Sequence, residues 1–112
     1  MTKEELRQYR SIKLEICQLD GRIKELVQLG RDHDRELIQP LMDVYQLKLE
    51  NLVICQLKIE RAIESLDPTE RELIRMRYID GAEWAEISDT LHYEWAQTHR
   101  IHARALTKIT NL

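Results

Sequence analysis

The segment from Trp95 to Leu112 carries three cationic side chains and no acidic one. Arg100, Arg104 and Lys108 are four residues apart, so on a helix they lie along one face. Arginine can form two parallel hydrogen bonds to guanine, and both arginine and lysine bind phosphate oxygens. The alternative is a solvated helix face, which is what most exposed arginine pairs are. The segment is a candidate contact for nucleic acid.

The remaining reactive side chains do not combine into a catalytic or metal site. His92, His99 and His102 are close in sequence, but no cysteine or carboxylate completes a ligand set around them. The cluster 32–34 (Asp-His-Asp) fills a short polar loop beside Gly30. We find no nucleophile, phosphate-binding loop or paired-acid site. We therefore expect no catalytic residues, no metal and no cofactor, and the chain is not expected to be an enzyme.

The composition favours solvated helices with apolar stripes. The chain has 112 residues, of which 33% are charged and 43% hydrophobic, with three glycines and two prolines. Its net charge is -3, so nucleic acid must be bound by a local basic patch and not by the overall field. Cys17 and Cys55 lie in amphipathic segments and are expected to be reduced thiols, buried or half-buried, with a disulfide as the minor alternative.

Two features bear on the compartment. The longest apolar run, Leu52 to Cys55, is far too short to cross a membrane. The first residues lack the apolar stretch of an export signal. We expect a cytoplasmic protein with no membrane partner.

The N-terminal half has the pattern of two long helices. From Lys3 to Leu29, alternating three- and four-residue steps predict a coiled-coil seam of Tyr9, Ile12, Ile16, Leu19, Ile23 and Leu26. Gly30 is predicted to end this helix, and Asp32 or Asp34 to cap the next. The second helix is predicted from about Pro40 to Leu66, because proline favours a first turn, and the turn before it could be kinked or separate.

The second helix is apolar on more than one face. Its seam is Leu41, Tyr45, Leu52, Ile59 and Leu66. It also carries Leu47, Leu49, Val53, Ile54 and Leu57, which one neighbouring helix cannot cover. We expect a second subunit, the C-terminal domain, or both to cover them, with a homodimer or higher homo-oligomer as the simplest solution. An antiparallel hairpin is mildly favoured, since parallel first helices would bring Glu15 near Asp20 of the mate.

A new unit begins at residues 67–70 (Asp-Pro-Thr-Glu), where Asp67 can cap a helix and Glu70 can reach back to its backbone N–H. This helix is predicted to run to Ile79 and to break at residues 80–81 (Asp-Gly). A short helix from 83 to 91 and a last helix to 109 follow, the latter with an inner face of Thr98, Ile101, Ala105 and Ile109. The order is that of a helix-turn-helix.

The sequence thus predicts an all-α chain in two domains. Residues 1–66 are expected to form an antiparallel helical hairpin or coiled coil that oligomerises, and residues 67–112 a three-helix helix-turn-helix domain.

Specific residues of the second domain match a known family. They are Leu66, Glu70, Arg71, Arg75 to Tyr78, Gly81, Trp84, Glu86, Ile87, Leu91 and the run Arg100 to Leu106. With these residues the stretch from Leu66 to Ile109 resembles region four of bacterial sigma factors. It more closely resembles small prophage-encoded regulators that are similar to region four.

The resemblance implies that the last helix reads DNA bases through Trp95, Ala96, His99 and Arg100, with Gln97 nearby. Trp95 and Ala96 stand where sigma factors usually have polar or charged side chains, so a target other than an ordinary promoter element is expected. Trp95 could equally pack on the adjacent helix. The resemblance also implies a packing role for Trp84.

The chemistry of the side chains assigns roles along the helix. Arg100 can contact guanine and Gln97 adenine, while Arg104, Lys108 and Thr107 are better placed for phosphates. The predicted function is a DNA-binding transcriptional regulator of the phage or prophage type, which reads the major groove of double-stranded DNA with the helix from about 94 to 109. RNA polymerase is a further candidate partner. The alternative is a protein-interaction module that binds RNA polymerase or another regulator and has little DNA affinity.

Overall fold

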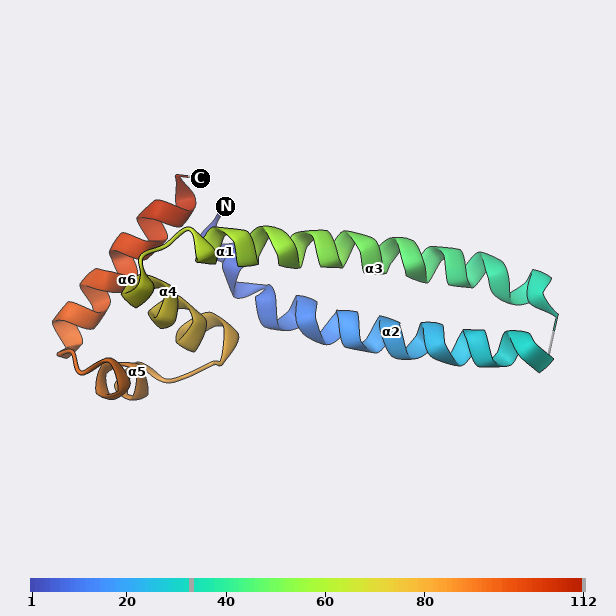
Figure 1. Cartoon of the computed structure of the whole chain (residues 1–112), viewed down its shortest axis with the longest axis horizontal. Helices are drawn as coiled ribbons and strands as arrows, with labels where there is room; N and C mark the ends of the chain where they lie inside the picture. The colour runs from blue at the N-terminus through green and yellow to red at the C-terminus, as the bar shows by residue number, and fades with distance from the viewer. Residues whose placement is uncertain (33, 112) are drawn as a thin grey trace. The chain divides into compact units, whose positions relative to one another are not determined.

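A computed structural model describes residues 1–32 and 34–111 of the chain, so His33 of the polar loop and Leu112 lie outside the description. The described residues form helices and contain no strand, which confirms the all-α class (Figure 1). The elements are α1 (Lys3–Arg7), α2 (Tyr9–Asp32), α3 (Arg35–Glu64), α4 (Pro68–Ile74), η1 (Arg75–Ile79), α5 (Trp84–Leu91) and α6 (Trp95–Thr110).

The chain divides into two compact units. The hairpin unit is residues 11–57, and the helix-turn-helix unit is residues 1–10 together with 58–112. The predicted boundary at residue 66 does not coincide with this division, because the first ten residues and the end of α3 belong with the helix-turn-helix. That the N-terminal part serves for oligomerisation stays a prediction.

In the hairpin unit, α2 and α3 run antiparallel, as expected (Figure 1). The predicted seam of the first helix is its most buried side. Ile12 and Leu19 are buried, and Ile16, Ile23 and Leu26 are half-buried. The spacing of apolar residues therefore correctly identified the face that packs.

Two predicted helix boundaries in the hairpin are wrong. Gly30 does not end α2, which continues to Asp32, because a glycine costs only about 1 kcal/mol in a helix and the backbone bonds continue past it. Pro40 lies inside α3, which begins at Arg35. A proline this near the helix start removes only one early backbone bond. Asp34 caps α3 as predicted, because its carboxylate accepts a hydrogen bond from the Glu36 N–H at 2.9 Å.

The two cysteines differ from expectation in burial. Cys17 and Cys55 are both free thiols, as predicted, but both are exposed and not buried or half-buried. No helix among the described residues is long and apolar enough to cross a membrane.

The helix-turn-helix unit is built around a core that includes the N-terminus of the chain. Leu6 of α1 is fully buried, and Tyr9 is 4% exposed. The end of α3 adds Ile59, Ala62 and Ile63, while Leu73, Ile74, Ile87, Ile101, Ala105 and Ile109 fill the centre of the three-helix domain. Residues 1–10 are therefore part of the scaffold that supports the helix-turn-helix.

The predicted helix from Pro68 to Ile79 changes geometry in its last turn. Residues Arg75–Ile79 form a π-helix, in which the Asp80 N–H donates to the Arg75 carbonyl at 2.9 Å. The chain then turns at Gly81, whose φ of 72° confirms the predicted break. Short π-helical turns are often found at functional sites.

The connection from α5 to α6 is a tight turn. His92 has a φ of 60°, a left-handed conformation that histidine enters more readily than most residues. The Ser88 hydroxyl lies 3.0 Å from that of the buried Thr98, which ties α5 to α6. Glu83 and Glu94 occupy the N-cap positions of α5 and α6, and neither side chain forms a capping hydrogen bond.

Candidate nucleic-acid interface

Helix α6 presents two different faces. Its inner face consists of Thr98, Ile101, Ala105 and Ile109, all buried, as predicted. Its other side carries the predicted contact residues Ala96, Gln97, Arg100, Arg104 and Lys108, all exposed. The apolar spacing therefore orients the helix so that these side chains face solvent.

The predicted contact residues Trp95 and His99 belong to a row of aromatic rings along one flank of α6. The Trp95 and His99 ring centroids are 4.2 Å apart, and those of His99 and Trp84 are 4.5 Å apart. His99 is thus half-buried between two tryptophans, and its Nε2 is buried with no hydrogen-bond partner among the described residues. This surrounding favours packing over base contact for His99.

The two tryptophans have different roles. Trp84 packs as predicted, with His102 at 4.7 Å between centroids and the Arg77 guanidinium 4.7 Å above the ring. Trp95 touches His99 but keeps 60% of its surface exposed. One side of Trp95 thus packs on a residue of its own helix, and the contact with DNA stays a prediction.

Two of the three cations of α6 are engaged by the start of α4. The Lys108 Nζ lies 2.6 Å from Glu70 Oε1 and 3.0 Å from Asp67 Oδ2. The Arg104 Nε lies 3.5 Å from Glu70 Oε2. Hydrogen bonding to Glu70 and then to Asp67 raises the pKa of Lys108, and the bond to Lys108 lowers the pKa of Asp67. The predicted phosphate contacts thus have a structural role as well.

Glu70 is the centre of this cluster. Its side chain is 1% exposed, and its Oε1 accepts a hydrogen bond from the Asp67 backbone N–H at 3.3 Å, as the capping pattern predicts. A buried carboxylate needs a cation to offset the loss of hydration. The cap was readable in the sequence, but the pairing with Lys108, 38 residues later, was not.

Arg100 has different surroundings. It is exposed, and none of the carboxylates within 1–32 and 34–111 forms an ion pair with it. Thr107, another predicted phosphate contact, donates its hydroxyl proton to the Ala103 carbonyl at 3.0 Å and keeps only acceptor capacity. Among the predicted polar contacts on α6, Arg100 and Gln97 are the side chains best able to donate to a ligand. That any of them touches DNA stays a prediction.

The comparisons with known proteins agree with this geometry. Residues 62–111 match the family described as Sigma-70, region 4. Neither the comparison with curated proteins nor that with solved structures finds a match. The matched residues begin in the last turns of α3 and include all of α4, η1, α5 and α6. The helix-turn-helix of residues 62–111 is therefore similar to sigma-factor region 4.

Proposed function

We propose that the chain is a DNA-binding transcriptional regulator of the phage or prophage type that reads the major groove with α6. The observation that carries this proposal is the exposed face of α6 within a sigma region-4-like helix-turn-helix. An α-helix fits the major groove when its outer side chains are solvent-exposed and its inner face is held by a scaffold. The four buried residues of α6 provide that support.

The proposed contacts differ in type along α6. Arg100 donates two hydrogen bonds to guanine, and Gln97 pairs with adenine in the same way. Ala96 and the exposed part of Trp95 offer apolar surface to a thymine methyl group. The Arg104 side chain is 62% exposed and that of Lys108 is 42% exposed. Both can therefore reach backbone phosphates of the duplex even though they also contact Glu70.

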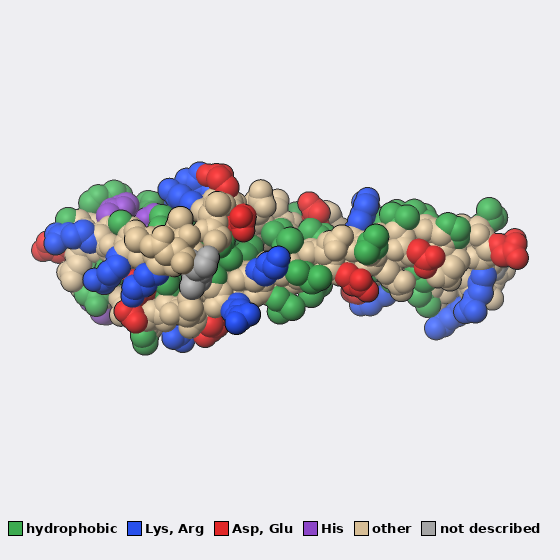
Figure 2. All heavy atoms as spheres, turned by 90° about the horizontal axis from the view of Figure 1, so that it is seen from above, with side chains coloured by type: hydrophobic (Ala, Val, Ile, Leu, Met, Phe, Trp, Pro, Cys, Tyr) green, Lys and Arg blue, Asp and Glu red, His purple; other side chains and the backbone are tan. Residues whose placement is uncertain are grey.

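Assembly through the hairpin unit is a second part of the proposal. Several large apolar side chains of this unit are at least 43% exposed: Leu14, Val27, Leu29, Leu37, Leu41, Val44, Leu47, Ile54 and Leu57. Hydrophobic side chains are visible among charged ones on the hairpin surface in Figure 2. Exposed apolar side chains that form a contiguous patch mark an interaction site. We propose a homodimer or higher homo-oligomer, with RNA polymerase as a further partner and no catalytic activity.

Selection of binding sites from a random duplex library tests the DNA-binding proposal directly. A dimer that presents two recognition helices should recover a palindrome whose half-site spacing follows the distance between those helices. The Arg100→Ala variant, selected in parallel, should lose the preference for one base pair. Failure to recover any motif would contradict sequence-specific binding.

An alternative function is a protein-interaction module that binds RNA polymerase or another regulator and has little DNA affinity. The observation that favours it is the engagement of Lys108 and Arg104 by Glu70, which reduces the positive charge that α6 offers to phosphates. An electrophoretic mobility shift with random-sequence duplex separates the two functions. No shift at low salt would favour the interaction module, because non-specific binding depends on cations that face the backbone.

A further inference from the structure

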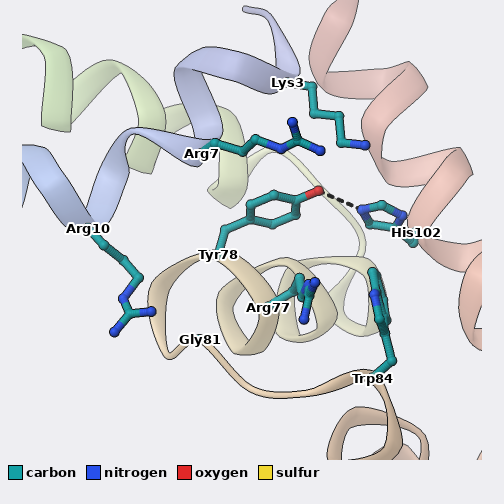
Figure 3. A pocket seen from close by; sticks show the side chains of 8 residues that line it. All are labelled: Lys3, Arg7, Arg10, Arg77, Tyr78, Gly81, Trp84 and His102. Atoms are coloured by element: carbon teal, nitrogen blue, oxygen red, sulfur yellow. Dashed lines mark hydrogen bonds between the residues drawn. The ribbon is translucent and has the colours of Figure 1, made fainter.

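The helix-turn-helix unit contains a basic pocket that includes the N-terminal segment of the chain. The pocket has a volume of about 400 Å³ and is lined by Lys3, Arg7, Arg10, Arg77, Tyr78, Gly81, Trp84 and His102 (Figure 3). Four of these side chains are cationic and, among the described residues that line the pocket, none is acidic. Concentrated positive charge in a concave site attracts anions.

The cations come from several elements that the core holds together. Lys3 and Arg7 lie on α1, Arg10 lies in the first turns of α2, and Arg77 lies in η1. The buried Leu6 fixes α1, so its charged residues are held near the others despite their mutual repulsion. A cluster of like charges costs free energy unless an anion offsets it.

Few groups of the chain offset this charge. Arg7 pairs with Glu4 at 3.0 Å, but this pair is largely exposed. Arg77 donates to the Ala82 carbonyl at 3.1 Å and lies over Trp84. Lys3 and Arg10 form no ion pair within the described part of the chain. Arginine and lysine donors therefore remain for a ligand.

The Arg10 guanidinium lies beside the turn at Gly81. A Cβ atom at Gly81 would overlap the Arg10 guanidinium, so the absence of a side chain lets that group lie against the turn. The turn already requires glycine for its positive φ. Gly81 thus contributes both the end of the π-helix and the space for one of the cations.

The opposite wall of the pocket supplies a hydrogen-bonded polar pair. The Tyr78 hydroxyl and the His102 Nε2 are 2.7 Å apart (Figure 3). Burial, followed by the charge of Lys3, lowers the pKa of His102 to about 4. The imidazole is therefore neutral at neutral pH, and the pair can supply polar contacts without adding charge to the pocket.

We propose that this pocket binds a phosphate group. Arginine forks match phosphate oxygens, and several cations lining one pocket suit a group with two negative charges better than a carboxylate with one. The phosphate could come from the backbone of a bound duplex or from a free phosphorylated small molecule. The proposal does not rest on base reading by α6, because most of the cations lie on other helices. Lys3 and Arg7 lie on α1 and Arg10 lies on α2, all outside the matched residues 62–111.

Titration calorimetry with pyrophosphate tests for a free ligand. The test variant is Arg7→Gln/Arg10→Gln, and the control is Lys13→Gln/Arg31→Gln, which removes the same charge from exposed positions of α2 outside the pocket. The test variant should bind pyrophosphate at least about tenfold more weakly than the control, because charge-assisted hydrogen bonds are lost. Unchanged thermal unfolding would show that both variants remain folded.

The salt dependence of binding to a random duplex tests for a backbone phosphate. The slope of the logarithm of the binding constant against the logarithm of the salt concentration should be less steep for the test variant than for the control. The difference should correspond to the loss of about one phosphate contact. An effect on pyrophosphate identifies a free phosphate ligand, and an effect only on this slope identifies the DNA backbone. Equal behaviour of the two variants in both assays would overturn the proposal.

A measurement on the unmodified chain keeps the test independent of the variants. Pyrophosphate, or the duplex, should shift the side-chain NMR resonances of His102 in the pocket. The exposed His92, which does not line the pocket, should shift much less. If His102 shifts no more than His92 with either ligand, the pocket is not a phosphate site. The result with pyrophosphate is independent of whether α6 reads bases, which the site selection tests.

Discussion

At the scale of single residues, the cations of α6 have different surroundings and should act differently. Arg100 is exposed and unpaired within the described chain, whereas Lys108 is held by Glu70 and Asp67. A side chain already bound to carboxylates must give up part of that interaction to bind phosphate. Base reading is therefore expected to depend most on Arg100.

The Arg100→Ala variant should lose about 1–3 kcal/mol at the preferred site and lose discrimination at one base pair. The physical reason is the loss of a two-bond contact to one base. Competition binding against specific and random duplexes measures both effects. If affinity for the two duplexes fell equally, Arg100 would contact phosphate and not a base.

His102 predicts a pH dependence of stability. Its pKa in the folded chain is about 4, below the ordinary 6.5, mainly because of burial and also because cations surround it. These neighbours are Lys3 and Arg7 of α1, Arg77 of η1 and His99 of α6. The unfolded chain therefore binds more protons between these two pKa values. Stability should fall as the pH drops from about 6.5 towards 4. The shift corresponds to at most about 3 kcal/mol, and the solvent exposure of the half-buried ring reduces the expected contribution of His102 to about 2 kcal/mol.

Urea unfolding at several pH values measures this contribution. The His102→Asn variant keeps a polar partner for Tyr78 but cannot titrate in this range, so its stability should vary less with pH. A pH dependence identical to that of the unmodified chain would assign the effect to carboxylates elsewhere.

At the scale of elements, the buried carboxylate of Glu70 links the start of α4 to the end of α6. The Lys108→Gln variant should lower the melting temperature, since Glu70 would keep a buried charge with only the longer contact to Arg104. Lys13→Gln on α2 is the matched control. The double variant Lys108→Gln/Glu70→Gln should recover part of the loss. Equal melting temperatures for Lys108→Gln and the control would show that the pair contributes nothing.

Helix α1 provides another element-scale prediction. The Leu6→Asp variant should unfold the helix-turn-helix unit, at a cost of about 3–5 kcal/mol, because an unpaired charge would replace a fully buried apolar side chain. The control is Leu14→Asp, since Leu14 is 59% exposed. Near-ultraviolet circular dichroism and tryptophan fluorescence report on the unit that contains Trp84 and Trp95. Native signals for Leu6→Asp would mean that α1 is dispensable.

At the scale of the whole molecule, the exposed apolar side chains of the hairpin predict assembly. Light scattering at tens of micromolar should give a dimer or larger species. The variant Leu47→Glu/Leu57→Glu should dissociate it, because both side chains are 60% exposed in the single chain and charge at an interface is costly. A monomeric mass for the unmodified chain would contradict this assembly and leave the hairpin surface to another partner.

The sequence by itself determined those features that depend on neighbours within about one helical turn. The seam of α2, the cap formed by Asp67 and Glu70, the turn at Gly81 and the inner face of α6 were all readable. Backbone hydrogen bonds and side-chain periodicity couple residues only a few positions apart, so their signals are local. Gly30 and Pro40 were misread because helix continuity outweighed a weak local preference.

Only the tertiary structure decided which distant residues meet. The burial of Leu6 in the helix-turn-helix unit, the pairing of Lys108 with Glu70, and the presence of Arg7 and Arg10 in one pocket with Tyr78 have no local signal. Such contacts depend on how the helices pack and on where side chains point once the apolar faces are buried. The sequence could therefore predict that α6 carries a contact surface, but packing alone determined which of its cations remain free and that the N-terminus supplies a basic pocket.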